Sequence, residues 1–402
     1  MGNEIIVRQA YLDKIKPFIG TNLIKVFVGQ RRVGKSYLLR MTAEFIKTRY
    51  PNANILFIDK ELYDFDAITD YKTLIQYIEK NYIEGIENFV FIDELQEIER
   101  FEKALRHFQN QNNLEIYCSG SNAQLLSGDL ATLLSGRYLK IEVSTLSYLE
   151  FLEFHGVANS EEALINYLKW GGLPFIRNLQ HTDEVVFDYL RNIISTIIYK
   201  DIIYRYKIRN VAFFDSLIHY LAANTGNLFT AQKISIYLKS QKVDISTKVV
   251  LNYLDNIKNA FLLHKLKRVD VNSKKVFEIN HKYYFEDWGL RNGLLGLSHF
   301  SVPDVLENVV FAHLKQLGYS VSIGVLKDLE IDFIAEKSGE LLYIQVAYLI
   351  TDAKVKEREF GNLLRINDNF KKIVVSMDPY TISDIKGIKH MHLRAFLTTQ
   401  SF

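Results

Sequence analysis

Short apolar runs alternate with amphipathic helical stretches over the first 145 residues. The runs are rich in Val, Ile and Phe, and they comprise Leu23–Val28, Ile55–Asp59, Phe89–Asp93, Glu115–Ser119 and Tyr138–Val143. Near-continuous apolar strands separated by helices are typical of a parallel sheet that is covered on both faces. The pattern therefore predicts a parallel α/β domain over residues 1–145.

A helical region and then a winged helix-turn-helix are expected after this domain. Apolar residues recur at spacings of three and four up to residue 225, and the turn Gly171–Pro174 interrupts them. Helices that begin at Thr230 and Ser246 then precede two β-rich runs, Phe261–Val269 and Lys275–Phe285. Two helices followed by a hairpin are the elements of a winged helix-turn-helix.

The rest of the chain is expected to form a small α/β module. Its predicted helix, three strands, helix and strand are Asp304–Leu317, Tyr319–Gly324, Glu330–Glu336, Leu341–Ala347, Thr351–Ile366 and Lys371–Ser376. This is the layout of restriction-endonuclease-like folds. The predicted domains are the parallel-sheet domain (1–145), a helical linker (146–225), the winged helix (226–297) and the endonuclease-like α/β module (298–402).

Composition excludes several classes of protein. The 49 basic and 47 acidic residues give a net charge of +2, so no global field attracts nucleic acid or acidic lipid. The single cysteine, Cys118, excludes an internal disulfide. The N-terminus lacks the apolar stretch of a signal peptide, and no apolar run approaches the ~20 residues that span a bilayer. We therefore expect a cytoplasmic protein without membrane contact.

The segment after the first apolar run matches the phosphate-binding motif G-x-x-x-x-G-K-[ST]. The expected nucleotide-binding residues are Gly29, Gln30, Arg31, Arg32, Val33, Gly34, Lys35 and Ser36, followed by Tyr37. The glycines let backbone N–H groups face the phosphates of ATP, and the following helix adds its N-terminal positive charge. Lys35 is expected to reach the β- and γ-phosphates, and the Ser36 hydroxyl to bind Mg²⁺.

Polar residues follow two further apolar runs. Asp93 ends one run and is expected on the Mg²⁺ ion, while Glu94 would polarise the attacking water. The other run ends near Ser119, Ser121 and Asn122, any of which could contact the γ-phosphate or the water. In the additional-strand class of P-loop ATPases, this second strand lies between the P-loop strand and the acidic strand. The alternatives are a helix-capping Asp93 and a simple Gly-Ser turn.

The chain resembles bacterial and archaeal AAA+ ATPases whose P-loop domain precedes a C-terminal domain of unknown function. The matching stretches are Gly29–Ser36, Phe91–Gln96, Ser119–Asn122, Leu133–Arg137, Ser147–Leu152, Gly171–Pro174, Lys200–Asp201, Leu221–Leu228, Asn252–Tyr253 and Tyr283–Leu290. The resemblance implies ATP binding, a winged-helix middle region and a degenerate nuclease-like C-terminus. In hexameric members, an arginine placed like Arg137 enters the neighbouring subunit's site, so a homo-oligomer is one expectation; a surface or structural arginine is the alternative.

The expected winged helix is locally basic. Eleven Lys or Arg oppose four acids between Lys233 and Lys282, an excess of seven positive charges. Lys242 and Lys248 flank the predicted recognition helix, and Lys274 and Lys275 lie at the wing tip. This arrangement suits sequence-nonspecific contacts to the phosphates of duplex DNA. A protein partner or a solvated surface is the alternative.

The expected nuclease-like module retains only part of a nuclease site. Glu307 and Asp332 occupy the positions of two metal-binding acids, but Gln345 replaces the third acid and Ala347 replaces the lysine. Three basic residues on the next predicted helix could substitute for the missing lysine, and they are Lys354, Lys356 and Arg358. We therefore expect the fold to persist without nuclease chemistry.

The leading hypothesis is an ATPase that uses ATP and Mg²⁺ to drive a conformational change on DNA or on a protein partner. A nucleotide-gated regulator or scaffold with little turnover is the alternative, and an ATP-controlled nuclease is a third.

Overall fold

The computed structural model describes residues 6–123, 134, 136–240, 245–379 and 384–402, and it falls into two compact units. Unit 1 comprises residues 1–144 together with 259–261, and unit 2 comprises residues 145–258 and 262–402. The end of unit 1 lies one residue from the predicted end of the parallel-sheet domain. The helical region, the two-helix segment up to residue 258 and the C-terminal module fall in unit 2.

Unit 1 is built on a parallel sheet with the strand order β2-β3-β4-β1-β5. The strands are β1 (Ile24–Val28), β2 (Asn54–Asp59), β3 (Asn88–Asp93), β4 (Leu114–Gly120) and β5 (Tyr138–Glu142). The predicted α/β class is confirmed, and each strand lies within about one residue of its predicted run. Strand β4 lies between β1 and β3, as expected for the additional-strand class.

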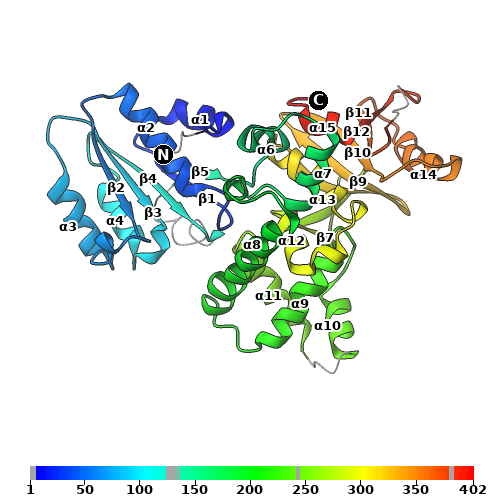
Figure 1. Ribbon diagram of the computed structural model, residues 1–402, viewed down its shortest axis with the longest axis horizontal. Coiled ribbons are helices and arrows are strands. Elements are labelled where there is room, and N and C mark those ends of the chain that lie inside the picture. Colours follow the sequence, from blue (N-terminus) through cyan, green and yellow to red (C-terminus); the bar gives the residue numbers. More distant parts are fainter. Residues whose placement is uncertain (1–5, 124–133, 135, 241–244, 380–383) are drawn as a thin grey trace. The chain divides into compact units, whose positions relative to one another are not determined.

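Helices cover both faces of this sheet (Figure 1). They are α1 (Gln9–Ile15), η1 (Lys16–Phe18), α2 (Lys35–Arg49), η2 (Tyr63–Phe65), α3 (Tyr71–Asn81), η3 (Leu95–Glu97) and α4 (Phe101–Phe108). Alternate side chains such as Val26, Val90 and Cys118 form one buried cluster with residues of α3 and α4. The opposite face carries Phe91 stacked on Tyr117, with ring centroids 4.9 Å apart. A two-sided apolar sheet explains why the strand sequences are near-continuously hydrophobic.

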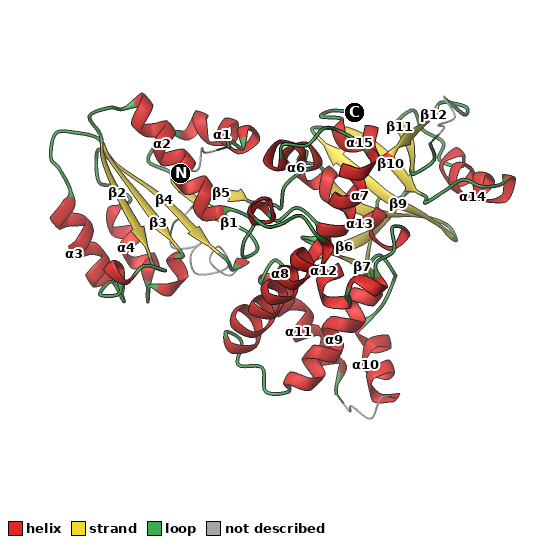
Figure 2. Ribbon diagram, in the orientation of Figure 1, coloured by secondary structure: helices red, strands yellow, loops and turns green. Residues whose placement is uncertain are grey.

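The described part of unit 2 begins with helices, and after α11 the strands of a mixed sheet alternate with further helices (Figure 2). The helices are α6 (Tyr148–His155), α7 (Glu161–Trp170), η5 (Pro174–Asn178), α8 (Asp183–Thr196), the π-helical η6 (Ile197–Tyr204), α9 (Val211–Ala223), α10 (Ala231–Ser240), α11 (Thr247–Asn259), α12 (Trp288–Leu295), η7 (Leu297–His299), α13 (Pro303–Gln316), α14 (Ala353–Leu364) and α15 (Leu393–Thr398). Among the described residues, none of the helices has both the length and the apolar character needed to cross a bilayer.

Helix α12 packs closely against α7, α8 and α9. A Cβ at Gly289 would lie 2.0 Å from the carbonyl oxygen of Trp170, and one at Gly293 would lie 2.7 Å from the Cβ of Leu190. The buried carboxylate of Asp287 accepts hydrogen bonds from the Gly172 N–H (2.8 Å) and from the Leu290 N–H (3.1 Å). The stretches Gly171–Pro174 and Tyr283–Leu290 therefore meet in one packing contact, which accounts for their glycines.

The sheet of unit 2 has the order β12-β11-β10-β9-β8-β6-β7. Its strands are β6 (Leu263–Asp270), β7 (Val276–Phe285), β8 (Ser320–Leu326), β9 (Leu329–Lys337), β10 (Glu340–Val346), β11 (Lys371–Ser376) and β12 (Ile388–His392). Strand β6 pairs with β7 in an antiparallel hairpin and with β8 in parallel, with Arg268 opposite Ile323. The hairpin expected as a separate wing is therefore the edge of the C-terminal sheet. Local periodicity located this hairpin, but it carries no information about which strand pairs with β6.

Candidate functional site

The phosphate-binding loop follows β1 and leads into α2. A Cβ at Gly29 would lie 2.3 Å from the carbonyl oxygen of Val143, so only glycine fits there. Gly34 is the N-cap of α2 with a φ of 99°, a left-handed conformation that favours glycine. The buried Lys35 Nζ donates to the carbonyl oxygen of Gln30 (2.9 Å). Both required glycines are thus explained by backbone geometry, and the lysine lies folded onto its own loop.

The variable positions of the loop have different surroundings. The Gln30 side chain is fully buried, and neither its nitrogen nor its oxygen has a hydrogen-bond partner among the described residues. Arg31 is buried and pairs with Glu61 (3.5 Å), whereas Arg32 is exposed. Val33 packs in the core, and the Tyr37 hydroxyl donates to the carbonyl oxygen of Ile6 (2.9 Å).

The two residues predicted to bind the metal lie together. Asp93, at the end of β3, accepts hydrogen bonds from the Ser36 and Ser119 hydroxyls. Burial, joined by the negative charges of Glu94 and Asp59, raises the pKa of Asp93, while the two hydroxyls act in the opposite direction. A buried carboxylate with acidic neighbours is a site where a nearby cation would stabilise the ionised form.

Glu94 directly follows the acidic strand. Its backbone is left-handed with a φ of 52°, and its N–H donates to the Asp93 carboxylate (3.1 Å) and to the Ser119 hydroxyl (3.1 Å). Glu94 as a whole residue is 92% buried, and its carboxylate accepts a hydrogen bond from the Gln96 side-chain amide. Sequence reasoning missed the role of Gln96, although it lies within a stretch shared with the AAA+ family.

The three polar candidates after β4 differ in their contacts. Ser119 bonds both Asp93 and the Glu94 N–H, so it serves the acidic strand. The Ser121 hydroxyl is buried and has no hydrogen-bond partner among the described residues. Asn122 is also buried. Ser121 is therefore the candidate whose hydroxyl is left available for a ligand.

Arg137 lies at the opposite end of the sheet from the loop of its own chain. Its carbonyl oxygen accepts from the N–H of Ile24, where β1 begins, and its exposed side chain donates to Asn110 (2.9 Å). The phosphate-binding loop begins where β1 ends, about 16 Å along the strand at roughly 3.3 Å per residue. Arg137 is thus too far away to act on its own chain's loop.

The structure also identifies Arg8, which was not among the predicted site residues. This arginine is 99% buried, and it donates to the carbonyl oxygens of Val33 (3.1 Å) and Ser144 (3.1 Å). Its guanidinium carbon lies 4.5 Å from the centroid of the Tyr11 ring. Arg8 therefore ties the phosphate-binding loop to the end of unit 1. A single arginine before a short helix gives no sequence signal for such a contact.

The lysines expected to contact DNA are unequally placed. Lys248, Lys274 and Lys275 are exposed, while Lys242 lies outside the described residues. The Lys274 ammonium lies 6.0 Å from the centroid of the Tyr343 ring on β10. The helices α10 and α11 also expose apolar side chains, namely Ile236, Tyr237 and Leu251.

The acids of the C-terminal module surround an unexpected lysine. Lys282 on β7 lies 3.1 Å from the Glu307 carboxylate and 2.8 Å from that of Glu330. Burial, and then the charge of Glu307, raises the pKa of the adjacent Asp332 well above its ordinary value, although Lys282 opposes this. The three basic residues of α14 that could have substituted for the missing lysine are all exposed, namely Lys354, Lys356 and Arg358. Arg358 pairs with Glu359. The missed residue is Lys282, which the β6–β7 hairpin supplies.

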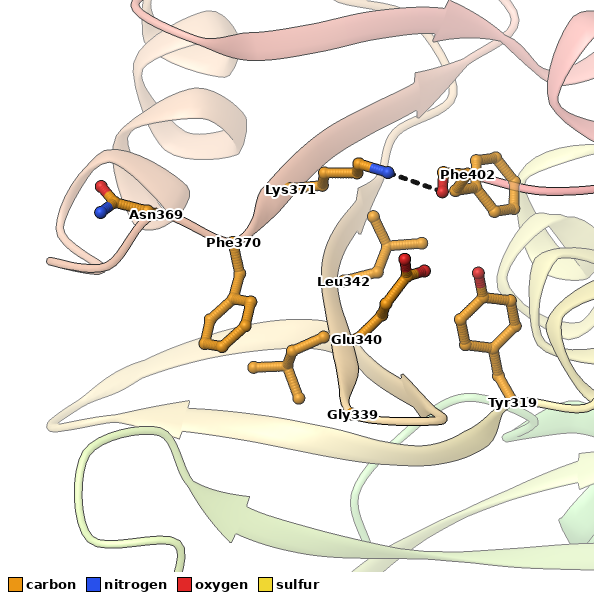
Figure 3. Close-up of a pocket in the computed structure, with 9 residues that line it drawn as sticks. Tyr319, Gly339, Glu340, Leu342, Asn369, Phe370, Lys371 and Phe402 are labelled. Atoms are coloured by element: carbon orange, nitrogen blue, oxygen red, sulfur yellow. Dashed lines mark hydrogen bonds between the residues drawn. The ribbon is translucent and has the colours of Figure 1, made fainter.

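A pocket of about 200 Å³ opens beside β9–β11 in unit 2 (Figure 3). Tyr319, Phe370 and Phe402 contribute aromatic rings, and the Lys371 ammonium donates to the carbonyl oxygen of Phe402 (2.7 Å). None of the predicted site residues lines this pocket.

Comparisons with known proteins agree with this description. An AAA domain matches residues 21–152, and a domain of unknown function (DUF8612) matches residues 161–301. The chain is 36% identical to an uncharacterized protein of Haemophilus influenzae over 98% of both chains. It is 30% identical to the uncharacterized protein MJ1544 of Methanocaldococcus jannaschii, over 90% of this chain and 83% of the relative.

A solved structure supports the fold alone. The Walker-type ATPase PABY2304 of Pyrococcus abyssi aligns with a TM-score of 0.51 at 16% identity, over 73% of this chain and 97% of the other. The phosphate-binding loop and the β2-β3-β4-β1-β5 sheet of unit 1 agree with these matches, and unit 1 has the fold of an ATP-binding P-loop AAA ATPase. The protein therefore belongs to the same family as the Haemophilus influenzae and Methanocaldococcus jannaschii relatives.

Proposed function

We propose that unit 1 hydrolyses ATP with Mg²⁺ at the site formed by the phosphate-binding loop and the end of β3. One observation carries the proposal: the hydroxyls of Ser36 and Ser119 meet on the Asp93 carboxylate, with Glu94 as the next residue. A protein that only holds nucleotide has no need of a second carboxylate beside the metal ligand.

The donor set fits a magnesium ion. Ser36 and Asp93 offer hard oxygen ligands, and Mg²⁺ takes its remaining ligands from water and phosphate oxygens. The burial that raises the pKa of Asp93 also means that a divalent cation would strongly favour its ionised form. When bound, the ion would neutralise charge that develops on the phosphates.

The chain's own residues divide the remaining work. Lys35, whose ammonium lies in the loop and donates to the Gln30 carbonyl oxygen, would bind the β- and γ-phosphates. Glu94 would orient and polarise the attacking water, and Gln96 would fix its carboxylate. The buried Ser121 hydroxyl would contact the γ-phosphate.

The test compares ATP binding and ATP hydrolysis in matched variants. Glu94→Gln should keep nucleotide affinity and lower kcat by about 10²–10⁴-fold, the usual contribution of a general base. Lys35→Ala should weaken binding itself. The control is Glu97→Gln, an exposed acid in the same segment, which should match the unchanged protein. Hydrolysis by Glu94→Gln at the original rate would remove the assignment of the base.

We further propose that ATP hydrolysis drives a conformational change on duplex DNA, or otherwise on a protein partner, which binds the basic segment of unit 2 between Lys233 and Lys282. The support is its excess of positive charge and the exposed Lys248 and Lys275. Affinity for duplex DNA should fall steeply across a salt series, and DNA should stimulate ATP turnover. A chain that does not bind DNA even at low salt would favour the protein partner, to which the exposed Ile236, Tyr237 and Leu251 are suited.

A further inference from the structure

The ammonium of Lys282 lies among carboxylates from two other elements of unit 2. Its distances are 3.1 Å to Glu307 on α13 and 2.8 Å to Glu330 on β9. The side chain of Lys282 is only 4% exposed. The Tyr284 hydroxyl also donates to the Glu307 carboxylate (2.6 Å). A lysine this deeply buried needs such partners, because an unpaired buried charge is very costly.

A neutral oxygen completes the surroundings of these acids. Gln345 is 93% buried, and its side-chain oxygen has no hydrogen-bond partner among the described residues. Strands β9 and β10 are antiparallel with Phe333 opposite Ile344, so Gln345 lies opposite Asp332 on the same face of the sheet. The Asp332 carboxylate is itself held by the N–H of Val346 (2.8 Å). An unsatisfied amide oxygen and a carboxylate on the same face of the sheet are the kinds of oxygen ligand that a hard cation binds.

The residues as they stand do not fit a divalent metal ion. No group of three His, Cys, Asp or Glu side chains within the described ranges could hold one. The third acid of a nuclease site is the neutral Gln345, and a positive charge already lies between the carboxylates of Glu307 and Glu330. Adding a divalent ion would place it beside an ammonium with little solvent to separate the two charges.

We infer that Lys282 is the built-in cation of this site, and that its ammonium takes the place of the metal that the acids would otherwise bind. The site is then complete without a cofactor. It cannot activate water as a metal ion does, because an ammonium is not a Lewis acid and does not lower the pKa of a coordinated water. Its role is structural: the ion pairs join the β6–β7 hairpin to α13 and β9.

The consequence is a latent metal site that appears when the lysine is removed. Lys282→Ala should leave the Glu307 and Glu330 carboxylates, which now pair with the ammonium, together with the neighbouring Asp332 and Gln345 side chains, around an emptied space. We expect this variant to bind Mn²⁺, which takes the same ligands as Mg²⁺. The unchanged protein and Lys282→Arg, which keeps the charge, should show no Mn²⁺ binding at these residues.

The experiment titrates Mn²⁺ against the full chain and follows thermal unfolding of unit 2 by tryptophan fluorescence. Both tryptophans, Trp170 and Trp288, belong to unit 2, so the readout does not depend on metal bound at the phosphate-binding loop. Mn²⁺ should raise the unfolding temperature of Lys282→Ala, and adding Asp332→Asn should abolish the increase. If Lys282→Ala does not fold alone, Mn²⁺ should restore its folding.

Three results would overturn the inference. The first is a Lys282→Ala variant that neither binds Mn²⁺ nor is rescued by it. The second is an Mn²⁺-dependent stabilisation of unit 2 in the unchanged protein that Asp332→Asn removes. The third is metal-dependent nicking of plasmid DNA by the unchanged protein. ATP hydrolysis plays no part in any of these measurements, so the proposed ATPase activity is tested separately.

Discussion

The buried ion pair between Lys25 and Glu115 makes a sharp prediction about the stability of unit 1. The Lys25 ammonium and the Glu115 carboxylate are 2.5 Å apart, and their side chains are 0% and 6% exposed. Lys25 also donates to the Thr21 carbonyl oxygen (2.9 Å), while Glu115 accepts from the Tyr117 hydroxyl (2.9 Å) and from the Gly20 N–H (2.5 Å). Burial lowers the pKa of Lys25 despite the neighbouring carboxylate.

Replacing one partner should cost much more than replacing both. Glu115→Gln keeps the shape of the side chain but leaves the Lys25 charge buried without a counterion, which costs about 3–5 kcal/mol. The double variant Lys25→Met with Glu115→Gln removes both charges and should recover most of this loss, since the net contribution of a buried pair is small. The exposed Glu79–His107 pair offers a control in the same unit, where Glu79→Gln should cost less than about 1 kcal/mol.

The assay separates the two units. Unit 1 contains no tryptophan, so its stability is best followed by hydrogen exchange of peptides from β1 and β4. Glu115→Gln should accelerate this exchange, while the tryptophan-monitored unfolding of unit 2 stays unchanged. If Glu115→Gln and the double variant lost the same amount of stability, the ion pair would be stabilising unit 1 on balance. That result would refute the argument that the cost of removing the two charges from water offsets their attraction.

Three further predictions concern the nucleotide site and the interior of unit 2. Ser121→Ala should lower ATP turnover at least tenfold and leave unfolding of unit 1 nearly unchanged, because its hydroxyl has no protein partner; Ser119→Ala should cost about 1–3 kcal/mol of stability as well. A Ser121→Ala variant that is less stable but hydrolyses ATP at the normal rate would contradict the proposed contact with nucleotide. Burial raises the pKa of Asp287 from 3.8 to about 6, so its contribution to stability is complete below pH 3.8 and is lost as the pH rises through 6. Asp287→Asn should therefore remove the dependence of the unfolding free energy of unit 2 on pH between 3.8 and 6, as measured by tryptophan fluorescence. A dependence that persists in this variant would show that Asp287 is not the group responsible. If Arg137 acts in a neighbouring subunit, specific ATPase activity should rise with protein concentration and Arg137→Ala should abolish the rise; activity that is independent of concentration would exclude the interaction.

Features with a local cause were predictable from the sequence. The strands of unit 1 follow from runs of Val, Ile and Phe, and the phosphate-binding loop follows from glycines whose positions are fixed by backbone geometry. Strand β12 and helix α15 were not predicted, because Ile388–His392 is short and alternates only weakly.

Features that depend on distant contacts could not be predicted. Arg8 bonds Ser144 from 136 residues away, and Lys282 reaches Glu307 across 25 residues only because β6 pairs with β8. Neither contact leaves a periodicity or a spacing in the sequence. The position of an arginine or lysine within the fold, and not its presence in the chain, decides its role.

The pairing of the hairpin also changes the electrostatic argument for DNA. Of the eleven basic residues counted between Lys233 and Lys282, Lys282 is neutralised in its buried ion pairs, and Lys274 lies over the Tyr343 ring. A hairpin that forms a sheet edge is also less able than a projecting wing to enter a groove. The helices α10 and α11 expose Lys233, Lys239, Lys248 and Lys258, and the hairpin exposes Lys265, Lys267 and Lys275. If duplex DNA binds, the salt dependence of its affinity should therefore decrease when Lys248 is replaced and remain nearly unchanged when Lys274 is replaced, because each lost phosphate contact reduces the slope by about one.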